Sequence, residues 1–142
     1  MSNSALKTEP NTGIFQNFHA AIVGVPDVDK ARDWYENVLE LKPAKIMEGE
    51  HGGSFMAIYR LDTTTHLCLF LSPEAGQGLT ANGLINFRTD DIEGVRAKLI
   101  ERGTDCTEAN NMGAVSYFTL KDPFGNRIDV CQFTKEWLPY LS

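Results

Sequence analysis

The side chains best suited to chemistry are Asp129, Arg88 and Asn86, each in a segment with the pattern of a β-strand. A guanidinium such as that of Arg88 can bind a carboxylate or phosphate through two parallel hydrogen bonds. A carboxylate such as Asp129 can accept a hydrogen bond from an amine or act as a general base. Alternatively, Arg88 and Asp129 pair with each other between neighbouring strands. For Asn86, a structural hydrogen bond and a ligand contact are equally open.

Cysteine is the other residue type in this chain with intrinsic reactivity. Cys68, Cys106 and Cys131 form an odd set at irregular spacing, with no C-x-x-C pair. This pattern predicts neither a disulfide framework nor a zinc knuckle, and reduced thiols are the simple interpretation. Cys68 and Cys131 are expected to be small core residues, because no histidine is evidently placed to activate either thiol.

Composition limits the partners that this chain could bind. The 142 residues carry 13 basic and 19 acidic side chains, a net charge of −6, and the basic residues are scattered. Nucleic-acid surfaces and anionic-membrane surfaces need clustered basic residues, so neither partner is expected, whereas a cationic or neutral small molecule is. The N-terminus lacks the apolar stretch of a signal peptide, and the longest apolar run is too short to cross a bilayer, which predicts a cytoplasmic protein.

The elements that would position these side chains follow a repeated order. In the first half a buried strand is expected over residues 18–25 and is ended by Pro26. Asp27 caps a helix whose apolar residues recur at helical spacing. After that helix we expect a turn at Gly52 and Gly53 and three strands, over residues 43–48, 54–61 and 66–71.

The second half repeats this order after a Gly-rich connector over residues 72–83. Asp91 caps a helix closed by Gly103, and Asp27 superposes on Asp91 at an offset of 64 residues. The expected strands cover residues 84–89, 105–108, 115–120 and 127–133, with a loop over residues 109–114 and a tight reversal at residues 122–126. The pattern predicts an α+β fold made of two βαβββ units. Residues 1–13 are expected to be a flexible tail, and residues 134–142 to dock through their aromatic and leucine side chains.

Three stretches of this repeat resemble a known family. They are PDVDKARDWYENVLEL in the first unit, and DDIEGVRAKLIERG and DPFGNRIDV in the second. The chain is similar to the vicinal oxygen chelate superfamily of glyoxalase I, extradiol dioxygenases and bleomycin-resistance proteins. The resemblance implies one domain over residues 14–142, with units over about 18–73 and 84–133. Each unit would form part of an incomplete barrel around a central cavity, often completed by a second subunit, so a homodimer is expected.

The resemblance also implies four positions at which relatives hold a divalent metal. In this sequence they fall on Ala20, Leu84, a residue near Leu69, and Asp129. Three are apolar and the fourth is a shortened acid, whereas a catalytic zinc site takes three protein ligands. No metal and no other cofactor is therefore expected. A β-bulge that turned His19 inward would give His19 and Asp129 as an alternative pair.

If those positions face the cavity, strand alternation identifies its wall. The residues expected there are Ala20, Ile22 and Gly24 on the first strand, Leu84, Asn86 and Arg88 on the fifth, and Arg127, Asp129 and Cys131 on the last. An apolar wall with a few convergent polar groups is typical of a small-molecule site. We expect Asn86, Arg88, Arg127, Asp129, Ala20 and Leu84 to bind the small molecule, with Asp129 the catalytic residue if there is catalysis.

Three functions remain open from the sequence. The first is a cofactor-independent protein of the bleomycin-resistance type that sequesters a small, preferably cationic, molecule in a dimer. The second is an enzyme of the same superfamily, either a metal-dependent lyase, isomerase or dioxygenase, or a metal-free enzyme that uses Asp129 as a base. The third is a regulatory or scaffold subunit whose cavity is filled.

Overall fold

The structure is a computed structural model, and it describes residues 11, 13–50, 52–73 and 85–140. The tail predicted for residues 1–13 and the connector predicted for residues 72–83 fall almost wholly outside this set. Leu84 lies outside it as well.

The first unit has the predicted order of strand, helix and three strands. Its elements are β1 (Ala20–Val25), α1 (Val28–Asn37), β2 (Pro43–Glu48), β3 (Ser54–Arg60) and β4 (His66–Leu71). They form a sheet in the order β1-β4-β3-β2, in which β1 runs parallel to β4. The helix begins where predicted, because the Asp27 side chain accepts a hydrogen bond from the Lys30 amide.

The second unit repeats the topology. Its elements are β5 (Ile85–Arg88), α2 (Ile92–Glu101), β6 (Asn110–Asn111), β7 (Val115–Lys121) and β8 (Arg127–Phe133), in the sheet order β5-β8-β7-β6. Asp91 caps α2 through the Gly94 amide. Glycine at position 94 leaves room for this cap, because a Cβ there would clash with the Asp91 carboxylate in its capping position. Two βαβββ units in an open barrel confirm the predicted α+β fold.

One predicted strand is wrong. Residues 105–108 form no strand, and β6 lies instead within the predicted loop over residues 109–114. At the predicted place only Cys106 makes an isolated bridge, to Leu120. The Thr119 amide donates to the Thr107 hydroxyl, 2.8 Å away. The side chain of Thr107 thus takes a hydrogen bond that a continuous backbone ladder would use.

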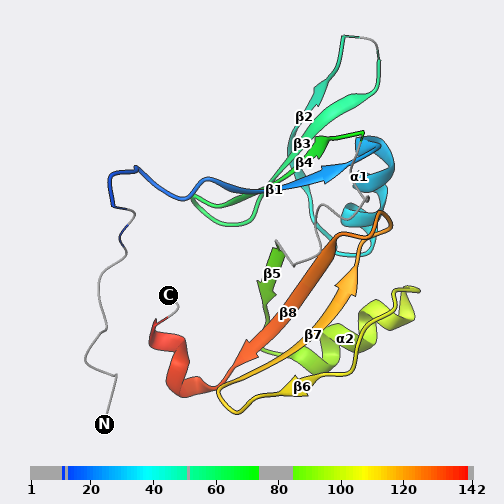
Figure 1. Cartoon of the computed structure of the whole chain (residues 1–142). Coiled ribbons are helices and arrows are strands. Elements are labelled where there is room, and N and C mark those ends of the chain that lie inside the picture. The colour runs from blue at the N-terminus through cyan, green and yellow to red at the C-terminus, as the bar shows by residue number, and fades with distance from the viewer. Residues whose placement is uncertain (1–10, 12, 51, 74–84, 141–142) are drawn as a thin grey trace.

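The core lies on one face of each sheet, under the helix of that unit. Val23, Leu69 and Tyr59 are buried there in the first unit, and Phe118, Ile128 and Val130 in the second. Figure 1 shows the two units one above the other, with both helices on the right-hand side. Alternate residues of each strand point to the opposite face, which neither α1 nor α2 covers.

The reversal at residues 122–126 joins the two units as well as turning the chain. The Tyr35 hydroxyl, on α1, donates to Asp122 Oδ2 over 2.8 Å, and Asn126 Nδ2 donates to the Gly24 carbonyl over 3.1 Å. The amides of Phe124 and Asn126 donate to Asp122 Oδ1. Burial, and then the Asp122 carboxylate, raise the pKa of Tyr35 well above its ordinary value. The sequence predicts the turn but not this contact between units.

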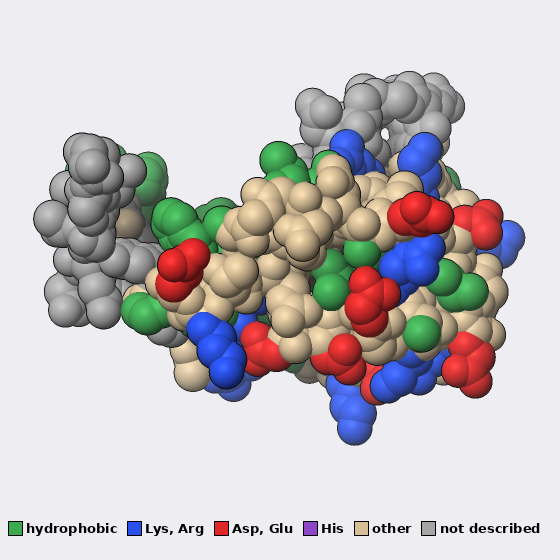
Figure 2. All heavy atoms as spheres, turned by 90° about the horizontal axis from the view of Figure 1, so that it is seen from below, with side chains coloured by type: hydrophobic (Ala, Val, Ile, Leu, Met, Phe, Trp, Pro, Cys, Tyr) green, Lys and Arg blue, Asp and Glu red, His purple; other side chains and the backbone are tan. Residues whose placement is uncertain are grey.

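The rest of the structure agrees with the apolar runs and the scattered charges of the sequence. Among the described residues, no helix is long and apolar enough to cross a membrane. Seen from below, acidic and basic side chains lie next to one another rather than in separate blocks (Figure 2). After β8 the chain forms a short 3₁₀ helix, Lys135–Tyr140, on which Trp137 is exposed and Leu138 is partly buried.

Candidate functional site

The open face of the second sheet gathers the polar side chains that the sequence identifies. The register places Asn86 of β5 beside Asp129 of β8, and Asp129 beside Thr119 of β7. Arg88 lies beside Cys131 in the same way. Residues paired across neighbouring strands point to the same face of a sheet, so these side chains share the face that α2 does not cover.

Asp129 is the centre of this polar face. Its Oδ1 accepts hydrogen bonds from Thr119 Oγ1 at 3.0 Å and from Arg127 Nε at 2.9 Å. Its Oδ2 receives a longer contact of 3.4 Å from Arg127 Nη2. The Asp129 side chain is 23% exposed. The carboxylate is thus oriented by two neighbours, and Oδ2 is the oxygen with more room for a further donor.

One prediction from the sequence, an ion pair between Arg88 and Asp129, is wrong. Arg88 Nη1 forms an ion pair with Asp90 at 2.9 Å, next to the start of α2. Asp129 pairs with Arg127 instead, which raises the pKa of the Arg127 guanidinium through that hydrogen bond. Arg127 is two residues away on the same strand and therefore on the same face, which makes it the nearer partner.

Two thiols, one in each sheet, are buried. Cys131 is buried, and desolvation raises the pKa of its thiol. Cys68 in the first unit is buried and shifted in the same direction for the same reason. A thiol with a raised pKa holds less thiolate at neutral pH, which agrees with their prediction as core residues.

The open face of the first sheet is apolar around Ile22 and Phe70, whereas the register places the polar side chains of His66, Arg60 and Lys45 on the same face farther from them. The register aligns Ile22 with Cys68 and Ile58, and Gly24 with Phe70. The alternation predicted for β1 is confirmed, because Val23 and Val25 are buried while Ile22 is 59% exposed. Ala20, aligned with His66, shares the face of Ile22.

The residues at the family's metal positions do not fit a metal. From the sequence, one of these metal positions is predicted near Leu69. Leu69 is fully buried on the α1 side of its sheet, so it does not face a cavity. The register makes Cys68 the open-face counterpart of Asp129, because Ile22 corresponds to Asn86 at the 64-residue offset. Within the described part of the chain, no three side chains of His, Cys, Asp or Glu are grouped so that they could hold a metal ion.

The alternative pair of His19 and Asp129 required a bulge in β1. The pairing of β1 with β4 runs without a shift from Ala20 to Val25, so the bulge is not found there. His19 precedes this ladder, is exposed, and lies with its ring 4.9 Å from that of His66. The His19 ring therefore lies beside a residue paired with Ala20, at the end of the sheet, and outside the ladder whose alternation defines the faces of β1.

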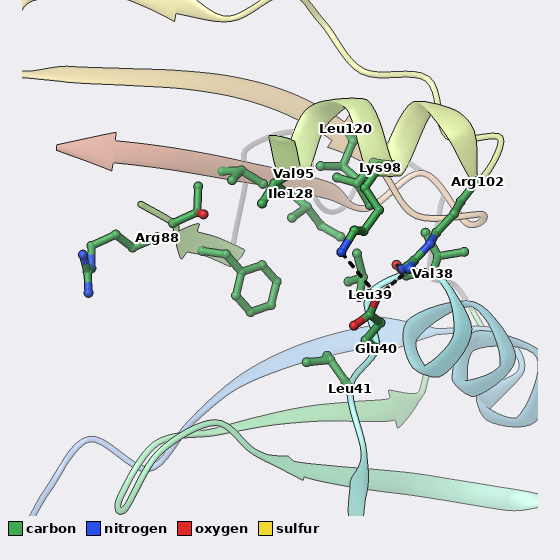
Figure 3. A pocket seen from close by; sticks show the side chains of 14 residues that line it. Val38, Leu39, Glu40, Leu41, Arg88, Val95, Lys98, Arg102, Leu120 and Ile128 are labelled. Atoms are coloured by element: carbon green, nitrogen blue, oxygen red, sulfur yellow. Dashed lines mark hydrogen bonds and ion pairs between the residues drawn. The ribbon is translucent and has the colours of Figure 1, made fainter. Parts of the chain in front are cut away.

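A separate cleft of about 280 Å³ lies between the two units, where the end of α1 meets α2 (Figure 3). Of the predicted site residues only Arg88 borders it, whereas Asn86, Arg127, Asp129 and Ala20 do not. Sequence reasoning missed this cleft. The sequence pattern places Val38 and Leu39 on the apolar face of a first helix over residues 28–40, whereas that helix ends at Asn37 and both side chains line the cleft.

Solved structures similar to this chain share its fold. TnmS3, an antibiotic binding protein from Streptomyces sp. CB03234, is 24% identical, with a TM-score of 0.71 over 87% of this chain and 100% of its own. A glyoxalase/bleomycin resistance protein from Catenulispora acidiphila is 22% identical, with a TM-score of 0.64 over 83% and 100%. Lactoylglutathione lyase from Agrobacterium tumefaciens is 16% identical, with a TM-score of 0.62 over 86% and 96%.

A search of curated proteins gives no match. A family model, in contrast, shows which family the chain belongs to. The model of the Glyoxalase/Bleomycin resistance protein/Dioxygenase superfamily matches residues 17–130, which span both βαβββ units. The tandem units, the register of their open faces and this match agree, and the chain belongs to the Glyoxalase/Bleomycin resistance protein/Dioxygenase superfamily.

Proposed function

We propose that this protein binds a small molecule between open sheet faces, without a metal and without transforming it. The observation that carries the proposal is the difference between the two faces. One is apolar around Ile22 and Phe70, and the other presents Asp129, Asn86 and Arg127. An apolar wall facing a few oriented polar groups is the usual construction of a small-molecule site.

The guest that fits best has an apolar body and a cationic group. The exposed Ile22 side chain offers a surface that a hydrophobic guest would remove from water. Asp129 Oδ2 can accept a hydrogen bond from an amine. A net charge of −6 favours the approach of a cation. The description of TnmS3 as an antibiotic binding protein is consistent with such a role for this fold.

A homodimer is part of the proposal. The open face of the first sheet leaves Ile22 and Phe70 59% and 41% exposed. A second copy whose polar face lay opposite would complete the cavity and cover this apolar surface. Ile22→Glu should therefore weaken both self-association, measured by analytical ultracentrifugation, and binding of the guest.

Catalysis by Asp129 is the alternative, and the contacts favour it less. Thr119 and Arg127 already donate to Asp129 Oδ1. A carboxylate held in this way is better suited to accept a hydrogen bond from a bound amine than to remove a proton. A metal-dependent lyase, isomerase or dioxygenase would need ligands that these positions do not supply.

Calorimetric titration with metal-free bleomycin, a cationic glycopeptide, and with a panel of small aromatic amines tests the proposal. We expect saturable binding by at least one of these probes. Asp129→Asn should weaken it roughly tenfold, the effect of one charge-assisted hydrogen bond. Asp105→Asn, a change at an exposed carboxylate elsewhere in the second unit, should have no effect. Binding that Asp129→Asn leaves unchanged would contradict the site.

The absence of a metal is tested by elemental analysis of the purified protein. We expect far less than one equivalent of zinc, nickel, manganese or iron per chain. A stoichiometric content of any of them that was lost in Asp129→Asn would replace the binding role with metal-assisted catalysis.

A further inference from the structure

The cleft between the ends of α1 and α2 has an apolar interior. Leu39 and Leu41 from the first unit face Phe87, Val95 and Leu99 from the second. Its volume of about 280 Å³ equals that of about nine water molecules in the liquid. It therefore has room for a compact ligand of the size of a short fatty acid or an arylalkanoic acid. None of the side chains that hold Asp129 line it.

Cationic side chains surround the mouth of this cleft, together with a single carboxylate. Arg102 donates to the Val38 carbonyl at 2.7 Å and also to the Glu40 carboxylate. Lys98 Nζ lies 4.0 Å from Glu40 Oε2, which is ion-pair range but too far for a hydrogen bond. Figure 3 shows the amine of Lys98 directed toward Glu40, whereas Arg88 points away. The Lys98 ammonium therefore has N–H donors available at the mouth of the cleft.

Glu40 occupies this place in an unfavourable backbone conformation. Its φ is +63°, and it is the one non-glycine residue with positive φ within the described part of the chain. The left-handed position just after a helix is usually taken by glycine, which adopts it without strain. A glycine here would remove the strain but would bring no carboxylate to Arg102 and Lys98. Backbone strain kept at the mouth of a cavity points to a role for the side chain.

We propose that the cleft binds a small monocarboxylate with an apolar body, and that Glu40 is the internal occupant it competes with. The apolar body would lie against Leu39, Val95 and Leu99, and the carboxylate would meet Lys98 and Arg102. The mouth already stabilises one carboxylate, since Arg102 and Lys98 lower the pKa of Glu40. The site is separate from the proposed guest site, so either can fail without the other.

The test is calorimetric titration of the full chain with octanoate, and with octan-1-ol as the neutral molecule of the same tail. We expect saturable octanoate binding. Lys98→Glu should weaken it roughly tenfold, because an attractive contact at a half-exposed site becomes repulsive. Glu40→Gln should tighten it about threefold, because the competing charge is removed. Octan-1-ol should respond to neither change.

Three controls make the outcome decisive. Lys30→Glu makes the same charge reversal on an exposed lysine of α1 that does not line the cleft, and it should leave octanoate binding unchanged. Asp129→Asn should also leave it unchanged. Val95→Phe, which fills the cleft, should weaken octanoate and octan-1-ol alike. The proposal is overturned if octanoate does not saturate, if Lys98→Glu and Lys30→Glu act equally, or if Glu40→Gln weakens binding.

Discussion

The two units have the same covered faces and different open faces. Under the helices both sheets present alternating buried apolar residues, such as Leu69 in the first and Val130 in the second. On the open side the register aligns Ile22 with Cys68 in the first unit, where the second aligns Asn86 with Asp129. The repeat is thus kept where packing against a helix requires it. It has diverged on the faces that no helix covers, and these are where a guest can bind.

The turns that end the third strand of each unit differ in the same way. The Asp62 side chain is exposed and accepts hydrogen bonds from the Thr64 and Thr65 amides of its own turn. Asp122 is buried and also accepts from Tyr35 of the other unit. The strand registers place Leu61 at the position equivalent to Asp122, so the second unit has a carboxylate that joins the units where the first unit has an apolar side chain.

The largest expected effect separates the covered faces from the open ones. Phe118→Ala removes a fully buried ring under α2 and should lower the free energy of unfolding by about 3–5 kcal/mol. Phe70→Ala removes a ring on the open side of the first sheet and should cost about 1 kcal/mol or less. Urea unfolding followed by circular dichroism measures both. Equal losses would show that the two faces are packed alike.

The next effect compares the two turns. Asp122→Ala removes the buried acceptor of the Tyr35 hydroxyl and of one Asn126 hydrogen bond, and should cost about 3 kcal/mol. Asp62→Ala removes the carboxylate from the corresponding turn of the first unit and should cost about 0.5 kcal/mol, because its partners can bond to water. If the two variants unfold at the same urea concentration, the turn of the second unit does not join the units.

Alkaline pH should reveal the same contact. The pKa of Tyr35 is raised above its ordinary value of 10.0 by burial and by Asp122, so the folded chain keeps this proton when the unfolded chain loses it. The stabilising contribution is complete below about pH 10 and falls above it, by at most about 1.4 kcal/mol per pH unit. Urea unfolding at pH 8, 10 and 11 measures the slope. Tyr35→Phe should make it shallower, and an unchanged slope would assign it to other groups.

A small effect on stability is also expected at the proposed site. Asp129→Asn keeps the hydrogen bond from Thr119 and loses only a partly exposed ion pair with Arg127, so it should cost about 1 kcal/mol or less. Thermal unfolding measures the change. A loss as large as that of Asp122→Ala would make Asp129 an internal structural residue rather than one kept for a guest.

The sequence predicts the fold well because the repeated signals are local. Asp27 and Asp91 cap their helices as predicted, and the apolar spacing identifies the faces that the helices cover. The strand wrongly predicted over residues 105–108 shows the limit of local patterns. There the Thr107 side chain takes a hydrogen bond that a strand would form through its backbone. The contact of Tyr35 with Asp122 joins residues 87 positions apart, and no local pattern could reveal it.

The candidate site is predicted only in part. Alternation correctly separates Ile22 from Val23 and groups Asn86 with Asp129. It cannot choose the partner of a long side chain, so Arg88 is paired wrongly with Asp129 when Asp90 is its partner. Leu69 is misplaced by one residue, and in a strand an error of one residue exchanges the faces.

Amide chemical-shift mapping with metal-free bleomycin tests most directly where a guest binds. The account predicts shifts on the open faces, at Asn86, Asp129 and Ile22, with Val95 and Leu99 of the cleft unchanged. Shifts confined to the cleft, or none anywhere at saturating probe, would contradict it.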